Sequence, residues 1–319
     1  MRNSILPVTV LTGFLGSGKT SLINRILKGD HGKRIAVMVN DFGRINIDEM
    51  LISSIDGNIV TLENGCACCS LANDLAMSFQ QVLPLSPDHI FVEASGVANP
   101  YAIVRTIQRP ALRNSVQLDS VIAMVDAAEF PSLYASGGNA NLRNLIVDQI
   151  TVADIIIVNK IDLVSEAELN EVKRQVQQIA RWARLITTCY ADIPMDIVMN
   201  LDIKPKAASP YSAVKADIGN HHNLFDSWSF ISDRPFSLSA LKKQLNQLPA
   251  SILRAKGVLM TSELPEERII LQQVGVRSNF THGGAWAKQT RRSQLVLIGL
   301  AGNLDKSQLQ HSFECCLAG

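Results

Sequence analysis

Between Leu6 and about residue 189, short apolar runs alternate with segments of helical period. The runs are rich in Val and Ile, which is typical of strands buried on both faces of a parallel sheet. The intervening segments place apolar residues three or four positions apart, as helices with one buried face do. We predict strands at Val8–Thr12, Arg34–Asn40, His89–Glu93, Ser120–Asp126, Ile155–Asn159 and Leu185–Thr188, and helices at Thr20–Leu27, Leu71–Leu83, Asn141–Thr151 and Glu166–Trp182.

This periodicity is lost between residues 202 and 223, where two prolines and a pair of histidines indicate a linker. Beyond it, apolar runs follow one another with few helices between them, which predicts a smaller, mostly antiparallel α+β domain. We predict domains at residues 1–201 and 224–319. The second domain is expected to contain strands at Trp228–Ile231, Leu253–Met260, Ile269–Val274 and Leu295–Gly299, and helices at Leu238–Leu248 and Lys306–Leu317.

Composition narrows the class of protein. A chain of 319 residues that is 47% hydrophobic can bury more than one core. The formal net charge of +1 argues against the clustered basic surface with which proteins bind nucleic acid or anionic lipid. No apolar run reaches the roughly 18 residues that a membrane span needs. We therefore expect a cytoplasmic protein whose partners are small ligands or other proteins, and self-association is left open.

A complete phosphate-binding loop follows the first predicted strand. The segment from Gly13 to Thr20 fits G-x-x-x-x-G-K-[ST] and is flanked by a strand and a helix, as that motif requires. Its glycines let backbone N–H groups point at phosphates, and the helix start adds partial positive charge. Lys19 should reach the β and γ phosphates, and the Thr20 hydroxyl should bind Mg²⁺. The predicted binding residues here are Gly13, Gly16, Ser17, Gly18, Lys19, Thr20 and Ser21.

A second motif indicates which base is bound. Asn159-Lys160-Ile161-Asp162 ends a late apolar strand, at the sheet edge where such folds bind ligands. The Asp162 carboxylate can accept hydrogen bonds from the ring N–H and amino group of guanine, whereas adenine would leave it unpaired. Lys160 is expected to lie along the base plane, and Asn159 to tie this segment to the phosphate loop. The sequence thus predicts binding of GTP and GDP.

Two further strand ends carry candidate residues for hydrolysis. Glu93 and Gly96 follow the third predicted strand, and we expect Glu93 to position Mg²⁺ or water and the Gly96 N–H to sense the γ-phosphate. Asp41 follows the second strand, at the place of a first switch loop, and is a candidate metal ligand. Asp126 also ends a strand, where it is interpreted as a simple strand terminator.

A thiol cluster lies between these strands. Cys66, Cys68 and Cys69 follow an Asn-Gly turn and are close enough for one ion to take two or three thiolates. Soft sulfur ligands favour Zn²⁺ or Cu(I). Buried, inert cysteines are the alternative reading. Cys189 is expected in the core, and we predict no metal role for Cys315 and Cys316 or for the histidines, which are judged to lack a partner at ligand spacing: His31, His89, His221, His222, His282 and His311.

Together these segments resemble the CobW-like metallochaperone GTPases, relatives of the GTPases that deliver nickel to urease and hydrogenase. The resemblance covers the phosphate loop, the segments around Asp41 and the three cysteines, Glu93-x-x-Gly96, and the Asn159 motif. It implies a P-loop α/β fold with a helix-covered, mostly parallel sheet, and a smaller α+β C-terminal domain. It also implies Mg²⁺-dependent GTP hydrolysis coupled to binding of a transition metal, usually Zn²⁺, by Cys66, Cys68 and Cys69, for delivery to a client metalloprotein.

Two features depart from the family, which commonly has Glu in place of Asp41 and a His-rich stretch where this chain keeps only two adjacent histidines. Two other readings compete with metal delivery. A GTPase switch would dock on a client enzyme and use its cysteines structurally or as a redox sensor. A small-molecule kinase would need a phosphate acceptor, for which the sequence offers no motif.

Overall fold

The computed structural model describes residues 5–29, 31–40, 71–135, 140–199, 225–286 and 290–318. The chain divides into two compact units between Leu201 and Asp202. The predicted linker at 202–223 lies outside the described residues, so its course stays a prediction. Among the described residues, no helix has the length and apolar character needed to cross a membrane.

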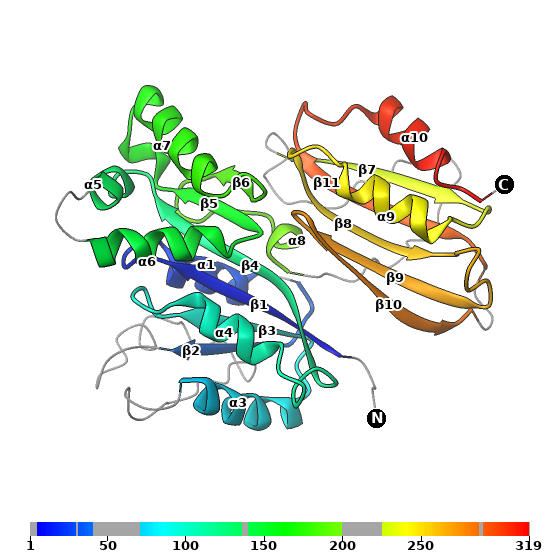
Figure 1. Ribbon diagram of the computed structural model, residues 1–319, viewed down its shortest axis with the longest axis horizontal. Coiled ribbons are helices and arrows are strands. Elements are labelled where there is room, and N and C mark those ends of the chain that lie inside the picture. The colour runs from blue at the N-terminus through cyan, green and yellow to red at the C-terminus, as the bar shows by residue number, and fades with distance from the viewer. Residues whose placement is uncertain are drawn as a thin grey trace. The chain divides into compact units, whose positions relative to one another are not determined.

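The first unit is built on a six-stranded sheet in which every pair of neighbours runs parallel (Figure 1). The strand order is β2-β3-β1-β4-β5-β6. This confirms the predicted parallel sheet. Its apolar strands, such as Ile155–Asn159, are buried along their whole length, as strands covered on both faces are. The strands are β1 (Leu6–Gly13), β2 (Ile35–Asn40), β3 (His89–Ala94), β4 (Val116–Asp126), β5 (Ile155–Asn159) and β6 (Arg184–Thr187).

Helices cover both faces of this sheet (Figure 1). α3, α4, α6 and α7 pack on the face that carries Val10, Val92 and Val125. Glu93 alternates with Val92 along β3 and so points to the other face, where α1 lies. The helices are α1 (Lys19–Lys28), α3 (Leu71–Val82), α4 (Pro100–Ile107), α5 (Phe130–Ala135), α6 (Ala140–Thr151), α7 (Glu166–Ile179) and α8 (Met195–Val198), with short 3₁₀ turns η1 (Leu83–Leu85) and η2 (Ile161–Leu163).

Several helix predictions need correction. α7 begins at a capping box between Ser165 and Glu168 but ends at Ile179 rather than at residue 182, because β6 already starts at Arg184 and the chain must leave the helix to reach it. α4, α5 and α8 were not predicted. α4 is short. The sequence feature that could have predicted its start is Asn99 followed by Pro100 at the first helical position, and in the structure the Asn99 side chain accepts a hydrogen bond from the Tyr101 N–H.

The second unit is a five-stranded antiparallel sheet, ordered β10-β9-β8-β11-β7, with α9 and α10 on one face (Figure 1). This confirms the predicted α+β fold. The prediction missed β10, an edge strand whose residues are mostly half-buried and therefore lack an apolar alternation. The elements are β7 (Phe225–Ser232), α9 (Leu238–Asn246), β8 (Ile252–Leu259), β9 (Glu267–Val274), β10 (Arg277–Ala285), β11 (Ser293–Leu300) and α10 (Lys306–Glu314).

Candidate nucleotide site

The phosphate loop connects the end of β1 to the start of α1, and its backbone requires glycine at two points. Gly13 and Gly18 have φ values of 136° and 107°, which side-chain-bearing residues rarely adopt. A Cβ on Gly13 would lie 2.2 Å from the Met124 carbonyl oxygen, and one on Gly18 would lie 2.3 Å from Asn159 Nδ2. Both glycines therefore allow the loop to sit directly against β4 and β5.

Lys19 is almost fully buried and folds back over the loop. Its ammonium group donates to the carbonyl oxygens of Gly13 at 2.8 Å and Phe14 at 3.1 Å. These acceptors lie on the loop itself, so the charge is already held where phosphate oxygens would bind.

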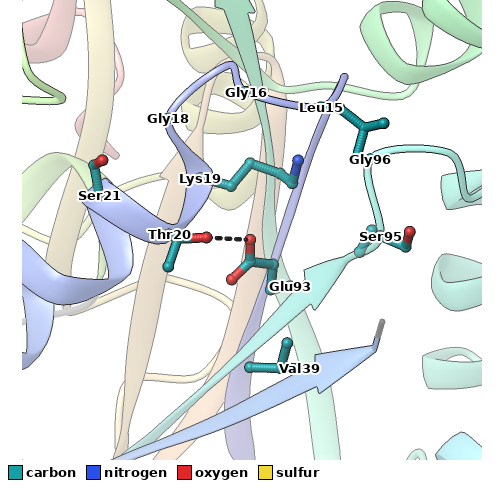
Figure 2. A pocket seen from close by; sticks show the side chains of 11 residues that line it. Leu15, Gly16, Gly18, Lys19, Thr20, Ser21, Val39, Glu93, Ser95 and Gly96 are labelled. Carbon is teal, nitrogen blue, oxygen red and sulfur yellow. Dashed lines mark hydrogen bonds between the residues drawn. The ribbon is translucent and has the colours of Figure 1, made fainter. Parts of the chain in front are cut away.

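A pocket of about 220 Å³ opens beside this lysine (Figure 2). Thr20, in the first turn of α1, donates its hydroxyl to Glu93 Oε1 at 3.2 Å, and Glu93 is only 3% exposed. A hydroxyl and a carboxylate side by side form a set of hard oxygen donors, which suits Mg²⁺ rather than a soft metal. The residues that line the pocket come from the phosphate loop, α1 and the ends of β2 and β3: Leu15, Gly16, Gly18, Lys19, Thr20, Ser21, Val39, Glu93, Ala94, Ser95 and Gly96.

The turn after β3, residues 95–99, faces the phosphate loop. A Cβ on Gly96 would lie 2.7 Å from the Leu15 backbone nitrogen, so the two backbones meet in a contact that only glycine permits. On its other side the turn is held by Gln149 of α6, whose side-chain amide donates to the Gly96 carbonyl oxygen at 3.0 Å. The sequence analysis did not predict Gln149 as a site residue. The available signal was a polar side chain on the apolar face of a helix, three residues after buried Ile146.

Asn159 joins the end of β5 to the phosphate loop. Its Nδ2 donates to the Ser17 carbonyl oxygen at 3.0 Å, and its Oδ1 accepts from the Ala191 N–H at 3.0 Å. The side chain is 2% exposed, so both hydrogen bonds are shielded from water. The structure thus brings together the two motifs, which lie 142 residues apart in the sequence.

The next residue, Lys160, adopts a left-handed conformation with φ 60°. Its ammonium group lies 2.6 Å from Asp126 Oδ2, while Asp126 Oδ1 accepts from the Ala128 N–H at 3.0 Å. Asp126 is therefore more than the strand terminator that the sequence suggested, because it also fixes the end of the Lys160 side chain.

Asp162 lies in η2, is exposed, and has the Cys189 thiol as its neighbour. Burial first, and then hydrogen bonding with the Asp162 carboxylate, raise the pKa of Cys189 above its ordinary value. Cys189 was expected on a strand in the core. Instead it follows the end of β6 and is half-buried, because β6 stops at Thr187 and the chain turns through Tyr190 and Ala191 in left-handed conformations.

Four predicted site residues, Asp41, Cys66, Cys68 and Cys69, lie outside the described residues. The described part of the chain contains no group of three or more His, Cys, Asp or Glu side chains able to hold a metal ion. That the histidines have no metal role stays a prediction. Two of the described histidines lie beside a residue of a type that can bind metal: His282 Nδ1 is 2.6 Å from Glu267 Oε2, and the other is His311. Its Nε2 lies 3.8 Å from Cys315 Sγ, because residues four apart share one face of a helix.

Comparison with known families decides the classification. Residues 7–187 match the nucleotide-binding domain of the CobW/HypB/UreG family, and residues 225–317 match the cobalamin synthesis protein cobW C-terminal domain. The chain belongs to the CobW/HypB/UreG family. Its fold is that of a P-loop NTPase with a smaller α+β domain, and the family is one of GTPases.

Members of the CobW/HypB/UreG family resemble this chain along nearly its whole length. The zinc chaperone CobW of a Sinorhizobium species is 30% identical, with 92% of this chain and 93% of the relative covered. The zinc chaperone YjiA of Escherichia coli is 29% identical, with 97% and 98% covered. The zinc-regulated GTPase metalloprotein activator 1 of Dictyostelium discoideum is 28% identical, with 95% and 73% covered.

Proposed function

We propose that this chain is a Mg²⁺-dependent GTPase that couples GTP binding and hydrolysis to the binding of zinc and its delivery to a client metalloprotein. The observation that carries the proposal is the contact between Asn159 and the Ser17 carbonyl oxygen, because it joins a base-selecting segment directly to a phosphate loop. The names of the relatives, zinc chaperones and a zinc-regulated GTPase, support the zinc part.

In this proposal each end of the site has its own task. Lys19 exchanges the carbonyl oxygens of Gly13 and Phe14 for phosphate oxygens, a stronger, charge-assisted contact. Thr20, with Glu93 beside it, would hold Mg²⁺, which would supply positive charge to offset the charge that develops on the phosphates. Glu93 orients the attacking water, and the Gly96 N–H senses the γ-phosphate. Asp162 reads the guanine base.

Zinc is the cargo in this proposal, held by Cys66, Cys68 and Cys69, with Asp41 as a candidate switch residue. Three thiolates leave one position of a tetrahedral zinc ion open, which suits a site that must release its metal. We further propose that the protein acts in the cytoplasm, where these thiols stay reduced.

The nucleotide part is tested by calorimetry with GTP, GDP and ATP in the presence of Mg²⁺. We expect GTP and GDP to bind at least about 10³-fold more tightly than ATP, because adenine leaves the Asp162 carboxylate unpaired. Equal affinities for GTP and ATP would contradict the guanine assignment. Turnover that persists without Mg²⁺ would contradict the assignment of Thr20 and Glu93.

The zinc part is tested by competition titration of Zn²⁺ against a chromophoric chelator, with GDP and with a non-hydrolysable GTP analogue. The two states should differ in Zn²⁺ affinity, and Zn²⁺ should change nucleotide affinity by the same factor. Equal zinc affinities would remove the coupling. Replacing Cys68 and Cys69 with Ser should remove bound zinc but leave GTP hydrolysis; loss of folding would favour a structural role for the cysteines.

A further inference from the structure

The turn after β3 is held from two sides, and one of the two holding groups comes from α6. Gln149 lies near the C-terminal end of α6 and is 2% exposed. Its side-chain Nε2 donates to the Gly96 carbonyl oxygen at 3.0 Å and lies 3.5 Å from the Ala98 carbonyl oxygen. One buried amide therefore binds two carbonyl groups of a single turn, at its start and at its end.

The neighbouring residue on α6 holds the outer end of the same turn. Asp148 Oδ2 accepts from Asn99 Nδ2 at 3.1 Å, and Asn99 in turn caps the start of α4. The Asp148 contact is exposed to solvent, whereas the Gln149 contacts are buried. Because hydrogen bonds in a water-free environment are stronger and costlier to lose, Gln149 is the firmer of the two attachments.

The phosphate loop lies on the opposite side of this turn. Leu15 approaches Gly96 so closely that a Cβ on Gly96 would lie 2.6 Å from Leu15 Cδ2. Leu15 and Gln149 also line one small cavity of about 20 Å³, at the base of the phosphate loop. Gly96 is therefore enclosed between the phosphate loop and the Gln149 amide, and it lines the nucleotide pocket at the same time.

We propose that Gln149 is a positioning residue for GTP hydrolysis, an inference that rests on the proposed GTPase function. Its side-chain amide fixes the peptide groups of the turn so that the Gly96 N–H stays directed at the γ-phosphate. Gln149 does not line the nucleotide pocket, and it acts only through the turn. Misplacement of a catalytic group by about 1 Å can lower a rate by up to about 100-fold, so loss of this attachment should affect turnover more than nucleotide binding.

The test compares two near-isosteric variants of the full chain. Gln149→Met keeps the volume of the side chain but removes the donor, and Gln149→Glu replaces the donor with a carboxylate facing two carbonyl oxygens. We expect kcat for GTP to fall about tenfold in Gln149→Met and further in Gln149→Glu, with KM and GDP affinity within about twofold of the parent. Gln175→Met is the matched control, because it removes a side-chain amide that donates to Glu171 Oε1 at 2.6 Å on the exposed side of α7, and Gln175 does not line the nucleotide pocket.

Hydrogen exchange gives a second readout that does not depend on turnover. The amides of residues 95–98 should exchange faster in Gln149→Met, while those of β3 should be unchanged. A fall in melting temperature with unaltered kcat and unaltered exchange in the turn would overturn the proposal and leave Gln149 as packing alone. If the parent protein fails to hydrolyse GTP, the proposed function fails, whereas the exchange experiment still decides whether Gln149 holds the turn.

Discussion

The phosphate end and the base end of the nucleotide site both follow a buried parallel strand, yet they are held together by different means. At the phosphate end the decisive contacts involve backbone, where Gly13 and Gly18 allow the loop to touch β4 and β5. At the base end they involve side chains, where Asn159 and Lys160 contact the Ser17 carbonyl and the Asp126 carboxylate. The first end depends on the absence of a side chain and the second on its presence.

This difference teaches what each end can discriminate. Backbone N–H groups offer the same donors to any nucleotide, so a glycine-rich loop binds phosphate without reading the base. In the proposed function the Asp162 carboxylate offers acceptors in one place only, and the wrong base would leave it unpaired. Substitutions at the two ends should therefore separate affinity for any nucleotide from preference among bases.

The largest expected effect comes from Asp162→Ala. GTP affinity should fall about 10³-fold while ATP affinity stays unchanged, because only guanine pairs with this carboxylate. Calorimetry with both nucleotides measures the change. Asp126→Asn is the comparison variant, since it loosens Lys160 and leaves Asp162 in place, and it should cost less than tenfold. An equal loss of GTP and ATP affinity in Asp162→Ala would show that the residue supports the fold instead.

The next effect is expected from Gly13→Ala. Its Cβ would lie 2.2 Å from the Met124 carbonyl oxygen, a backbone atom that cannot move without distorting β4. We expect about 3 kcal/mol or more of destabilisation, measured by urea unfolding without nucleotide. Gly16→Ala is the matched control, because no atom lies within 4 Å of the added carbon and only the cost of positive φ, about 1 kcal/mol, remains. Equal destabilisation of the two variants would mean that the positive φ, and not the contact with the Met124 carbonyl oxygen, causes the loss of stability.

Asn159→Ala should affect both ends at once. It removes the donor to the Ser17 carbonyl oxygen and the acceptor for the Ala191 N–H, both buried, at a cost of about 2 kcal/mol. We expect a melting temperature lower by about 5 °C and weaker binding of GTP and ATP alike. A selective loss of GTP binding would indicate that Asn159 serves only the base end.

The smallest effect concerns the Cys189 thiol. Because its pKa is raised, a smaller fraction is thiolate at a given pH, and alkylation by iodoacetamide at pH 8 should be slower than for an unfolded thiol. The rate should increase as the pH rises further. Asp162→Asn should raise the rate at pH 8 only in part, since burial, the larger cause, remains. Mass spectrometry of the alkylated peptide measures both rates, and a rate above that of the unfolded chain would contradict the geometry.

The sequence by itself determined the features that are local. Buried parallel strands appear as uninterrupted Val and Ile runs, and the phosphate loop appears as glycines at fixed spacing before Lys19 and Thr20, because both depend on residues close together in the chain. α4 and β10 escaped prediction. The first is short and the second lies at an exposed edge, so neither carries a strong apolar period.

Only the tertiary structure decided which distant groups meet. The strand order places β1 between β3 and β4, so the end of β3 lies beside the phosphate loop. Gln149 meets Gly96 across 53 residues, a contact that the sequence did not predict. The motif predicted that Asn159 reaches the phosphate loop, and the structure identifies the Ser17 carbonyl oxygen, 142 residues away, as its partner. Such contacts leave no periodic trace, because a buried polar side chain finds its partner through the packing of whole elements rather than through its neighbours in sequence.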